Sequence, residues 1–298
     1  MKIKVGSRGS KLALAQSRQI LSELEQKNPG IEFELIVIKT KGDIIQDVLL
    51  HKMNDKGIFV KEIEEALLTK KIDMAVHSMK DMPSTGTKGL KFFGVPKRED
   101  PRDAIVFAEG ITSIFDVPAN GKIGTGSKRR AFQLKRLRPD LDIVPIRGNV
   151  DTRIRKITDE NLAGVVLAAA GLKRLGLEEK IGQYLEVEEM IPAPTQGILA
   201  LQIREDDLRM EEILKKIEDE ESKEQMICER AFMEALGGSC HVPMGAYCLL
   251  DKEEALIYGV YGDEEGEKLV TKSIKSKRSE IEAAGRELAK ILVEELKS

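Results

Sequence analysis

Short apolar runs alternate with amphipathic helical patterns along the first half of the chain, and this alternation is the feature that most constrains the fold. Residues 2–5, 33–40 and 73–76 are typical of strands, and apolar residues at helical spacing lie between them. The same rhythm continues through the runs 104–108, 122–124, 143–147 and 164–170. Strand–helix–strand units of this kind predict parallel sheets flanked by helices, so the expected class is α/β.

Two segments interrupt the alternation and are predicted domain crossings. Residues 96–102 (PKREDPR) are charged, contain two prolines and lack apolar periodicity, and residues 191–197 (IPAPTQG) are the second crossing. After about Glu211 strands cluster apart from helices, which predicts a small α+β domain. We therefore expect domain 1 over residues 1–97 plus 197–212, domain 2 over 98–196 and domain 3 over 213–298, the first two being doubly wound lobes.

The composition excludes several classes of function. The 298 residues include 48 Lys and Arg against 51 Asp and Glu, so neither a disordered acidic tail nor a generally basic nucleic-acid binder is indicated. The longest apolar run is roughly half the ~18 residues needed to span a bilayer, and four basic residues before position 12 interrupt any signal-peptide core. We expect a cytoplasmic protein without nucleic-acid or membrane partners, and a monomer because no interface stripe is conspicuous.

The cysteines and histidines do not form a metal-binding pattern. Each type occurs three times at no spacing typical of zinc ligands, and an odd cysteine count argues against a disulfide framework. Cys228 and Cys248 lie among apolar residues at helix and strand spacing and are expected to be buried. Cys240 lies in the loop LGGSCHVP, where it is either an accessible thiol that is attacked or attached, or a buried structural residue.

One local pattern occurs twice, as VGSRGSK at residues 5–11 and as IGTGSKRR at residues 123–130. In each copy an apolar strand ends in Gly and Ser or Thr, and a serine suited to cap a helix follows, with arginine beside it. Backbone N–H groups at a helix start bind anions without any net basic charge. A single copy is explained by a well-capped helix, whereas the duplication suggests two similar lobes facing one anionic ligand.

Further basic residues follow the predicted strand ends, at Lys80, Arg147, Arg153 and Arg174. Ligands of open α/β sheets bind beyond the carboxyl ends of the strands, so this placement favours an anion site, with a solvated surface as the alternative for each residue. Arg129 and Arg130 are the best case, because guanidinium groups bind carboxylates or phosphates bidentately. Since neither a Walker motif nor GxGxxG spacing is present, a carboxylate-rich ligand fits better than a nucleotide.

Asp81 follows a predicted strand end in HSMKDMP, beside Lys80. It is either a structural cap of the loop, or a general acid/base or a stabiliser of a cationic intermediate. His77 lies one position inside the strand end, and a core histidine with satisfied hydrogen bonds is the favoured interpretation.

A series of ordered segments resembles the porphobilinogen deaminase family, also called hydroxymethylbilane synthases. They are VGSRGSKLALAQ, KGIFVKEIE, HSMKDMP, REDPRDA, GTGSKRRAFQL, IRGNVDTR, AAGLKRLG, PAPTQG and GGSCHVP. The resemblance implies three domains, with two lobes of the type found in bacterial solute-binding proteins and a third domain that carries the cofactor. It also implies a transferase that joins four porphobilinogen molecules head to tail with loss of ammonia, on a covalent dipyrromethane cofactor, and releases hydroxymethylbilane for tetrapyrrole biosynthesis.

The resemblance also assigns roles to the candidate residues. It implies that the cofactor is attached to Cys240 through a thioether and that Asp81 is the catalytic carboxylate. The residues expected to hold cofactor carboxylates are Lys80, Ser127, Arg129, Arg130 and Arg147. Those expected to receive substrate or to help expel ammonia are Arg8, Ser10, Arg153 and Arg174, with Ser78 and Lys56 as additional contacts. No metal is expected.

Three features of the resemblance concern loop segments of this chain. Residues 40–57 resemble the family's mobile loop over the active site and are a predicted lid. Ser239 stands where a second glycine usually precedes the cofactor cysteine, and PAPTQG replaces the commoner PAVGQG. Neither departure removes a group that the chemistry needs, so both concern loop geometry more than activity.

Two other classes of function stay open on the residues alone. One is a two-lobed binding protein for a carboxylate ligand, although neither an export signal nor a DNA-binding helix pair is evident. The other is a cysteine-nucleophile transferase or hydrolase, which requires a base near Cys240. His241 is adjacent in sequence, but side chains of neighbouring residues usually point apart.

Overall fold

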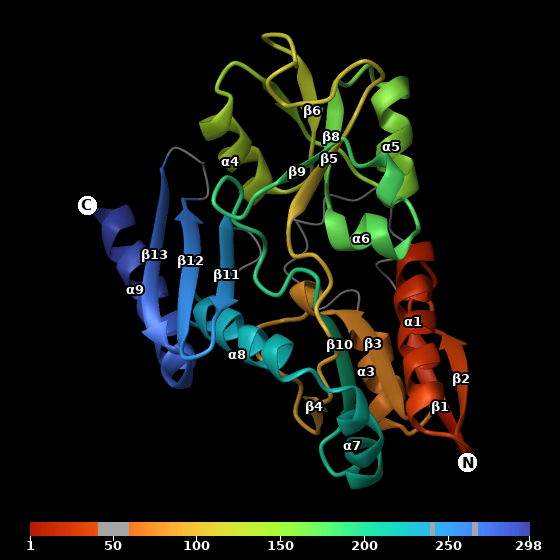
Figure 1. Cartoon of the computed structure of the whole chain (residues 1–298). Coiled ribbons are helices and arrows are strands. Elements are labelled where there is room, and N and C mark those ends of the chain that lie inside the picture. The colour runs from red at the N-terminus through yellow and green to blue at the C-terminus, as the bar shows by residue number, and fades with distance from the viewer. Residues whose placement is uncertain (41–59, 239–241, 264–267) are drawn as a thin grey trace. The chain divides into compact units, whose positions relative to one another are not determined.

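The computed structural model describes residues 1–40, 60–238, 242–263 and 268–298. Three sheets organise this described part, with strand orders β2-β1-β3-β10-β4, β7-β6-β8-β5-β9 and β11-β12-β13 (Figure 1). The chain divides into two compact units, Met1–Glu99 with Ile198–Lys223 and Asp100–Gly197 with Glu224–Ser298. The expected α/β class, with two doubly wound lobes and a small α+β C-terminal part, is confirmed, while the three-domain boundaries stay a prediction.

The first sheet alternates strand and helix along the chain. Its strands are β1 (Lys2–Ser7), β2 (Glu32–Val37), β3 (Met74–Ser78), β4 (Leu90–Phe92) and β10 (Leu199–Arg204). Strand β1 pairs in parallel with both β2 and β3, whereas β10 runs antiparallel to β3 and β4. The crossovers β1–α1–β2 and β2–α3–β3 place β1 between its two successors, which is the doubly wound arrangement.

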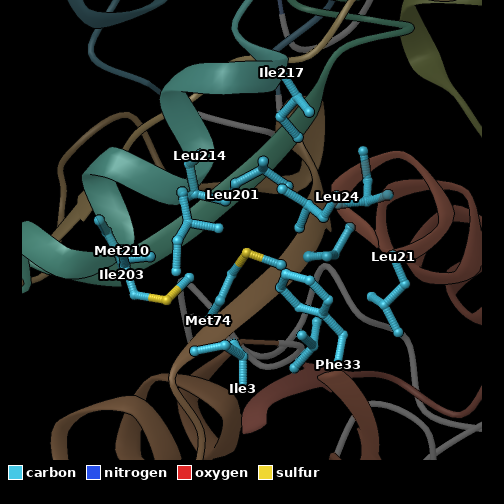
Figure 2. Packing of buried hydrophobic residues seen from close by; sticks show 14 of the residues in the cluster. Ile3, Leu21, Leu24, Phe33, Met74, Leu201, Ile203, Met210, Leu214 and Ile217 are labelled. Atoms are coloured by element: carbon cyan, nitrogen blue, oxygen red, sulfur yellow. The ribbon is translucent and has the colours of Figure 1, made fainter. Parts of the chain in front are cut away.

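Helices cover both faces of the first sheet. On one face, α1 (Lys11–Lys27) and α7 (Leu208–Leu214) bury apolar side chains such as Leu24, Met210 and Leu214 against Met74 and Leu201 of the strands (Figure 2). The other face is covered by α3 (Lys61–Leu68), whose residues Ile63, Ala66 and Leu67 join a second cluster. Burial of both faces explains why β3 and β10 are buried along nearly their whole length.

The second sheet repeats the order of the first. Its strands are β5 (Asp103–Phe107), β6 (Lys122–Gly124), β7 (Asp142–Val144), β8 (Gly164–Ala168) and β9 (Gln183–Leu185). Strand β6 pairs in parallel with β7 and β8, and β5 runs antiparallel to β8 and β9. Its helices are α4 (Lys128–Leu137), α5 (Val150–Asp159) and α6 (Ala169–Arg174). Strands β1 and β6 therefore occupy the same topological position, and each carries one copy of the duplicated motif.

The C-terminal elements form an antiparallel sheet covered by helices on one face. Strands β11 (Met244–Leu250), β12 (Glu254–Gly262) and β13 (Leu269–Lys277) pack against α8 (Glu220–Ala235) and α9 (Ile281–Lys297). Gly285 lets α9 approach α8 closely, since a Cβ there would lie 2.4 Å from the carbonyl oxygen of Cys228. Cys228 and Cys248 lie in this core as free cysteines, so their expected burial is confirmed.

The structure corrects part of the strand prediction. The first two sheets are mixed rather than parallel, because β10 and β5 run against their neighbours. Strands β4 and β9 have only three residues, too few for a periodic pattern, and all six residues of β10 are buried, so no alternation marks them. No helix among the described residues is long and apolar enough to cross a membrane.

Candidate functional site

Five of the predicted site residues meet at one edge of the first sheet. Strands β1 and β3 are parallel neighbours, so their carboxyl ends lie at the same edge. Arg8 and Ser10 follow β1, and Ser78 ends β3. The 3-10 helix η2 (Met79–Asp81) comes next and carries Lys80 and Asp81. This edge is where ligands bind in open α/β sheets.

Local hydrogen bonds fix the turn that carries Asp81. The Met79 N–H donates to the Ile198 carbonyl at 3.0 Å, and the Met82 N–H donates to the Met79 carbonyl at 3.0 Å. Gln16 Nε2 of α1 donates to Ser78 Oγ at 2.9 Å, which ties the helix to the end of β3. Asp81 itself is exposed. The arrangement holds an accessible carboxylate on an anchored backbone.

Both predicted helix caps are present. Ser10 has an extended backbone, and its Oγ accepts a hydrogen bond from the Ala13 N–H at 3.2 Å. Ser127 has the same conformation, and its Oγ accepts from the Arg130 N–H at 3.5 Å. Each helix start therefore presents backbone donors and a positive dipole end at the carboxyl edge of its sheet.

The second sheet carries its own basic edge. Strands β6, β7 and β8 are parallel and end near Ser127, Arg147 and the start of α6. Arg153 Nε of α5 donates to the Gly148 carbonyl at 2.8 Å, and Arg174 Nη2 of α6 donates to the Gly197 carbonyl at 2.7 Å. Ser127 and Arg147 thus follow the carboxyl ends of β6 and β7, and Arg153 lies early in α5, whereas Arg174 ends α6.

Arg129 and Arg130 are buried around a single carboxylate. Arg129 Nη1 donates to Asp103 Oδ2 at 2.7 Å and to the Ile191 carbonyl at 2.8 Å. Arg130 Nε donates to Asp103 Oδ1 at 2.9 Å. Burial raises the pKa of the Asp103 carboxyl, but the charges of the two arginines outweigh it and hold that pKa well below its ordinary value. Two positive charges against one negative leave this cluster cationic.

His77 is a buried residue of β3, one position before the end of that strand. The expected burial is confirmed, whereas the expected satisfaction of its hydrogen bonds is wrong, because neither His77 Nε2 nor the buried Gln202 Oε1 has a hydrogen-bond partner. Burial lowers the pKa of His77 to about 4; Gln202 opposes this shift and the nearby Arg8 charge adds to it. The imidazole is therefore neutral near neutral pH.

Some predictions fall on residues that the structure does not describe. These are the predicted cofactor cysteine Cys240 with its neighbours Ser239 and His241, the predicted contact Lys56, and all of the predicted lid except Thr40. Among the described residues, no group of three or more His, Cys, Asp or Glu side chains could hold a metal ion.

Three polar residues were not singled out from the sequence. Asp103 bonds to both arginines, Gln196 Nε2 donates to Asp103 Oδ1 at 2.9 Å, and Glu229 is a buried carboxylate on α8. Asp103 lies in the quoted segment REDPRDA, at the start of an otherwise apolar strand. A buried carboxylate needs a positively charged partner. An acidic residue at the start of a buried strand is therefore the one local signal that a buried cation packs against it.

The chain matches known proteins over nearly its whole length. Residues 3–212 match the family model described as "Porphobilinogen deaminase, dipyromethane cofactor binding domain", and residues 223–297 match the model of the C-terminal domain. The chain is 53% identical to the porphobilinogen deaminase of Clostridioides difficile over 99% of this chain and 98% of that protein. It is 54% identical to the Clostridium novyi porphobilinogen deaminase over 99% of this chain and 100% of that protein.

A solved structure is also similar. The crystal structure of the methionine-binding protein MetQ matches 75% of this chain and 93% of its own, with 14% identity and a TM-score of 0.46. The sequence matches cover both family models and nearly the whole chain. They show that the chain belongs to the porphobilinogen deaminase family.

Proposed function

We propose that Asp81 is the catalytic carboxylate of this enzyme and that Cys240 carries its cofactor through a thioether. The enzyme is a hydroxymethylbilane synthase, a transferase that joins four porphobilinogen molecules head to tail with loss of ammonia on a dipyrromethane cofactor. The product belongs to tetrapyrrole biosynthesis. The individual residue roles are inferred from the geometry of the two sheet edges and from the family motifs.

The donors at the second sheet's edge fit the cofactor. Each pyrrole ring carries an acetate and a propionate, so the cofactor needs several carboxylate partners. Ser127 at the start of α4, the exposed Arg147 and the cationic Arg129–Asp103–Arg130 cluster are donors of that chemistry. Lys80, on the first sheet's edge, is expected to add a further cation. When bound, the cofactor supplies the covalent anchor on which the pyrrole chain is extended.

The first sheet's edge fits the reacting substrate. Arg8, Ser10 and Ser78 offer hydrogen-bond donors for the substrate's own carboxylates, and Arg153 and Arg174 have the same chemistry on the other lobe. Lys56 is proposed as a further contact on motif grounds alone. Loss of ammonia leaves an electron-poor ring, whose positive charge the exposed Asp81 carboxylate stabilises while it moves a proton at its Oδ atoms.

The observation that carries this proposal is the repeated topology. Two sheets of the same strand order each place a serine-capped helix start and basic residues at the carboxyl ends of their parallel strands. A growing chain of carboxylated pyrroles requires such donors on more than one surface.

The intact mass of the purified protein tests the attachment. We expect wild-type protein to carry an adduct of two linked pyrrole units, and Cys240→Ser to carry none. Cys248→Ala, at a buried thiol, is the matched control and should keep the adduct. A wild-type mass that stays unmodified after incubation with porphobilinogen would overturn the proposal and favour a carboxylate-binding protein instead.

We also propose a cytoplasmic monomer. Cys228 and Cys248 lie as free thiols within one core, as a reducing compartment permits. Among the described residues, the exposed large apolar side chains come from separate elements and include Val37, Phe115 and Leu249. Light scattering after gel filtration should give one 33.2 kDa species; a dimer mass would contradict the monomer.

A further inference from the structure

The segment 191–197 is hydrogen-bonded both to the second sheet's helices and to the C-terminal elements of the same compact unit. The Ile191 N–H donates to Gln133 Oε1 at 2.9 Å, and Gln133 Nε2 donates back to the Ile191 carbonyl at 3.0 Å. On the other side, the Ala246 N–H of β11 donates to the Pro192 carbonyl at 3.1 Å. The segment therefore joins α4 to β11.

Thr195 has a left-handed backbone within this segment, with φ of 62°. That conformation is sterically unfavourable for a β-branched residue and easy for glycine. The commoner PAVGQG motif has a glycine at this position, so Thr195 is one of the residues at which this chain departs from that motif. Thr195 is 1% exposed, and its backbone N–H donates to Glu229 Oε2 at 2.5 Å.

Glu229 accepts hydrogen bonds from two different segments. Besides the Thr195 N–H, the Cys248 N–H of β11 donates to Glu229 Oε1 at 3.0 Å. The carboxylate is fully buried on α8. In the sequence, α8 and β11 are the elements on either side of Cys240. One carboxylate thus joins the two elements that flank the attachment cysteine to the left-handed residue.

Gln196 extends these contacts to the arginine cluster. Its Nε2 donates to Asp103 Oδ1 at 2.9 Å and to the Pro101 carbonyl at 2.8 Å. Its Oε1 accepts from Arg130 Nη2 at 3.4 Å. Because residue 196 directly follows Thr195, the backbone conformation at 195 sets where the Gln196 side chain lies.

We propose that Glu229 is a positioning residue for the arginine cluster. Its carboxylate holds Thr195 in the left-handed conformation, which seats Gln196 against Asp103 and orients Arg129 and Arg130 toward cofactor carboxylates. This inference rests on the proposed function of the arginines. Threonine requires the Glu229 contact because it disfavours this conformation, whereas glycine would adopt it unaided.

A double-mutant cycle tests the proposal. The variants are Glu229→Gln, Thr195→Gly and the double variant, and the readout is the rate at which apoenzyme gains the mass of the dipyrromethane from preformed hydroxymethylbilane. A neutral amide offers one acceptor oxygen for two backbone N–H groups, so Glu229→Gln should slow loading by about tenfold. In the Thr195→Gly background the same change should slow loading by no more than about twofold.

Two further variants sharpen the test. Glu234→Gln removes an exposed carboxylate of the same helix that pairs with Arg286 at 2.9 Å, and it should leave loading unchanged. Gln196→Met breaks the contacts one residue later, so its slowed loading should not be rescued by Thr195→Gly. This variant also provides the test if Glu229→Gln does not fold, as judged by circular dichroism.

The outcomes separate the two proposals. Equal slowing by Glu229→Gln in both backgrounds, or rescue of Gln196→Met by Thr195→Gly, would overturn the positioning role. Wild-type protein that never gains pyrrole mass would overturn the proposed cofactor attachment instead.

Discussion

Asp103 Oδ2 lies 2.7 Å from Arg129 Nη1, and Asp103 Oδ1 lies 2.7 Å from Arg130 Nη2, with all three side chains buried. Removing the one carboxylate would leave two buried guanidinium groups without a counter-charge. We expect Asp103→Asn to lower the free energy of unfolding by about 3–5 kcal/mol, measured by urea titration at neutral pH. The exposed Asp142→Asn is the control and should change stability by less than about 0.5 kcal/mol.

The loss of stability at acid pH gives a second test of the role of Asp103. The pKa of Asp103 is held below its ordinary value of 3.8 in the folded protein. Its contribution is therefore complete above that value and is lost as the pH falls through the folded pKa. The wild-type protein should lose stability below about pH 4, and the Asn variant should lack this component. Parallel acid profiles would contradict the ion-pair assignment.

Local features of the site were predictable from the sequence, whereas its long-range partners were not. Ser10 and Ser127 were predicted as caps because a capping serine and its bonded N–H lie three residues apart. Asp103 was missed because its partners lie 26 and 27 residues away on another element. No spacing rule connects a strand start to a helix across a sheet.

The strands divide in the same way: those with a local sequence signal were predicted, and features set by distant contacts were not. The strands β1 and β6 were found from short apolar runs that end in glycine followed by serine or threonine. The direction of β10 was not found, since it pairs with β3 more than a hundred residues earlier and is buried along its whole length. Similarly, the left-handed backbone of Thr195 depends on the contact with Glu229.

Asp81→Asn should separate chemistry from folding. The side chain is exposed and the turn is held by backbone hydrogen bonds, so the melting temperature should stay near wild type. Loss of the carboxylate should lower kcat on the order of 100-fold or more, because an amide neither accepts the proton nor stabilises the cationic ring. Steady-state turnover of porphobilinogen measures this, with the exposed Asp206→Asn as control. Near-normal turnover would refute the assignment.

The capping serines should contribute separately to stability and to anion binding. Ser10→Ala should cost about 1 kcal/mol, whereas Ser10→Gly should cost only a few tenths because glycine also tolerates the N-cap position. Ser127→Ala should cost less than Ser10→Ala, since its hydrogen bond is 3.5 Å rather than 3.2 Å. If the Ser10 hydroxyl also binds substrate, both Ser10 variants will raise KM by the same factor. An unchanged KM in both variants would mean that Ser10 acts only through stability.

His77 should make the folded protein sensitive to mild acid. Burial lowers its pKa to about 4 from an ordinary value of 6.5. Below pH 6.5 the unfolded chain therefore binds a proton that the folded chain does not, and stability falls as the pH decreases toward 4. The full loss is about 3 kcal/mol, since each pKa unit corresponds to about 1.4 kcal/mol. Urea titrations across this window should show the slope in wild type and in His51→Gln, but not in His77→Gln. A His77→Gln variant that keeps the wild-type slope would assign the acid sensitivity to other groups.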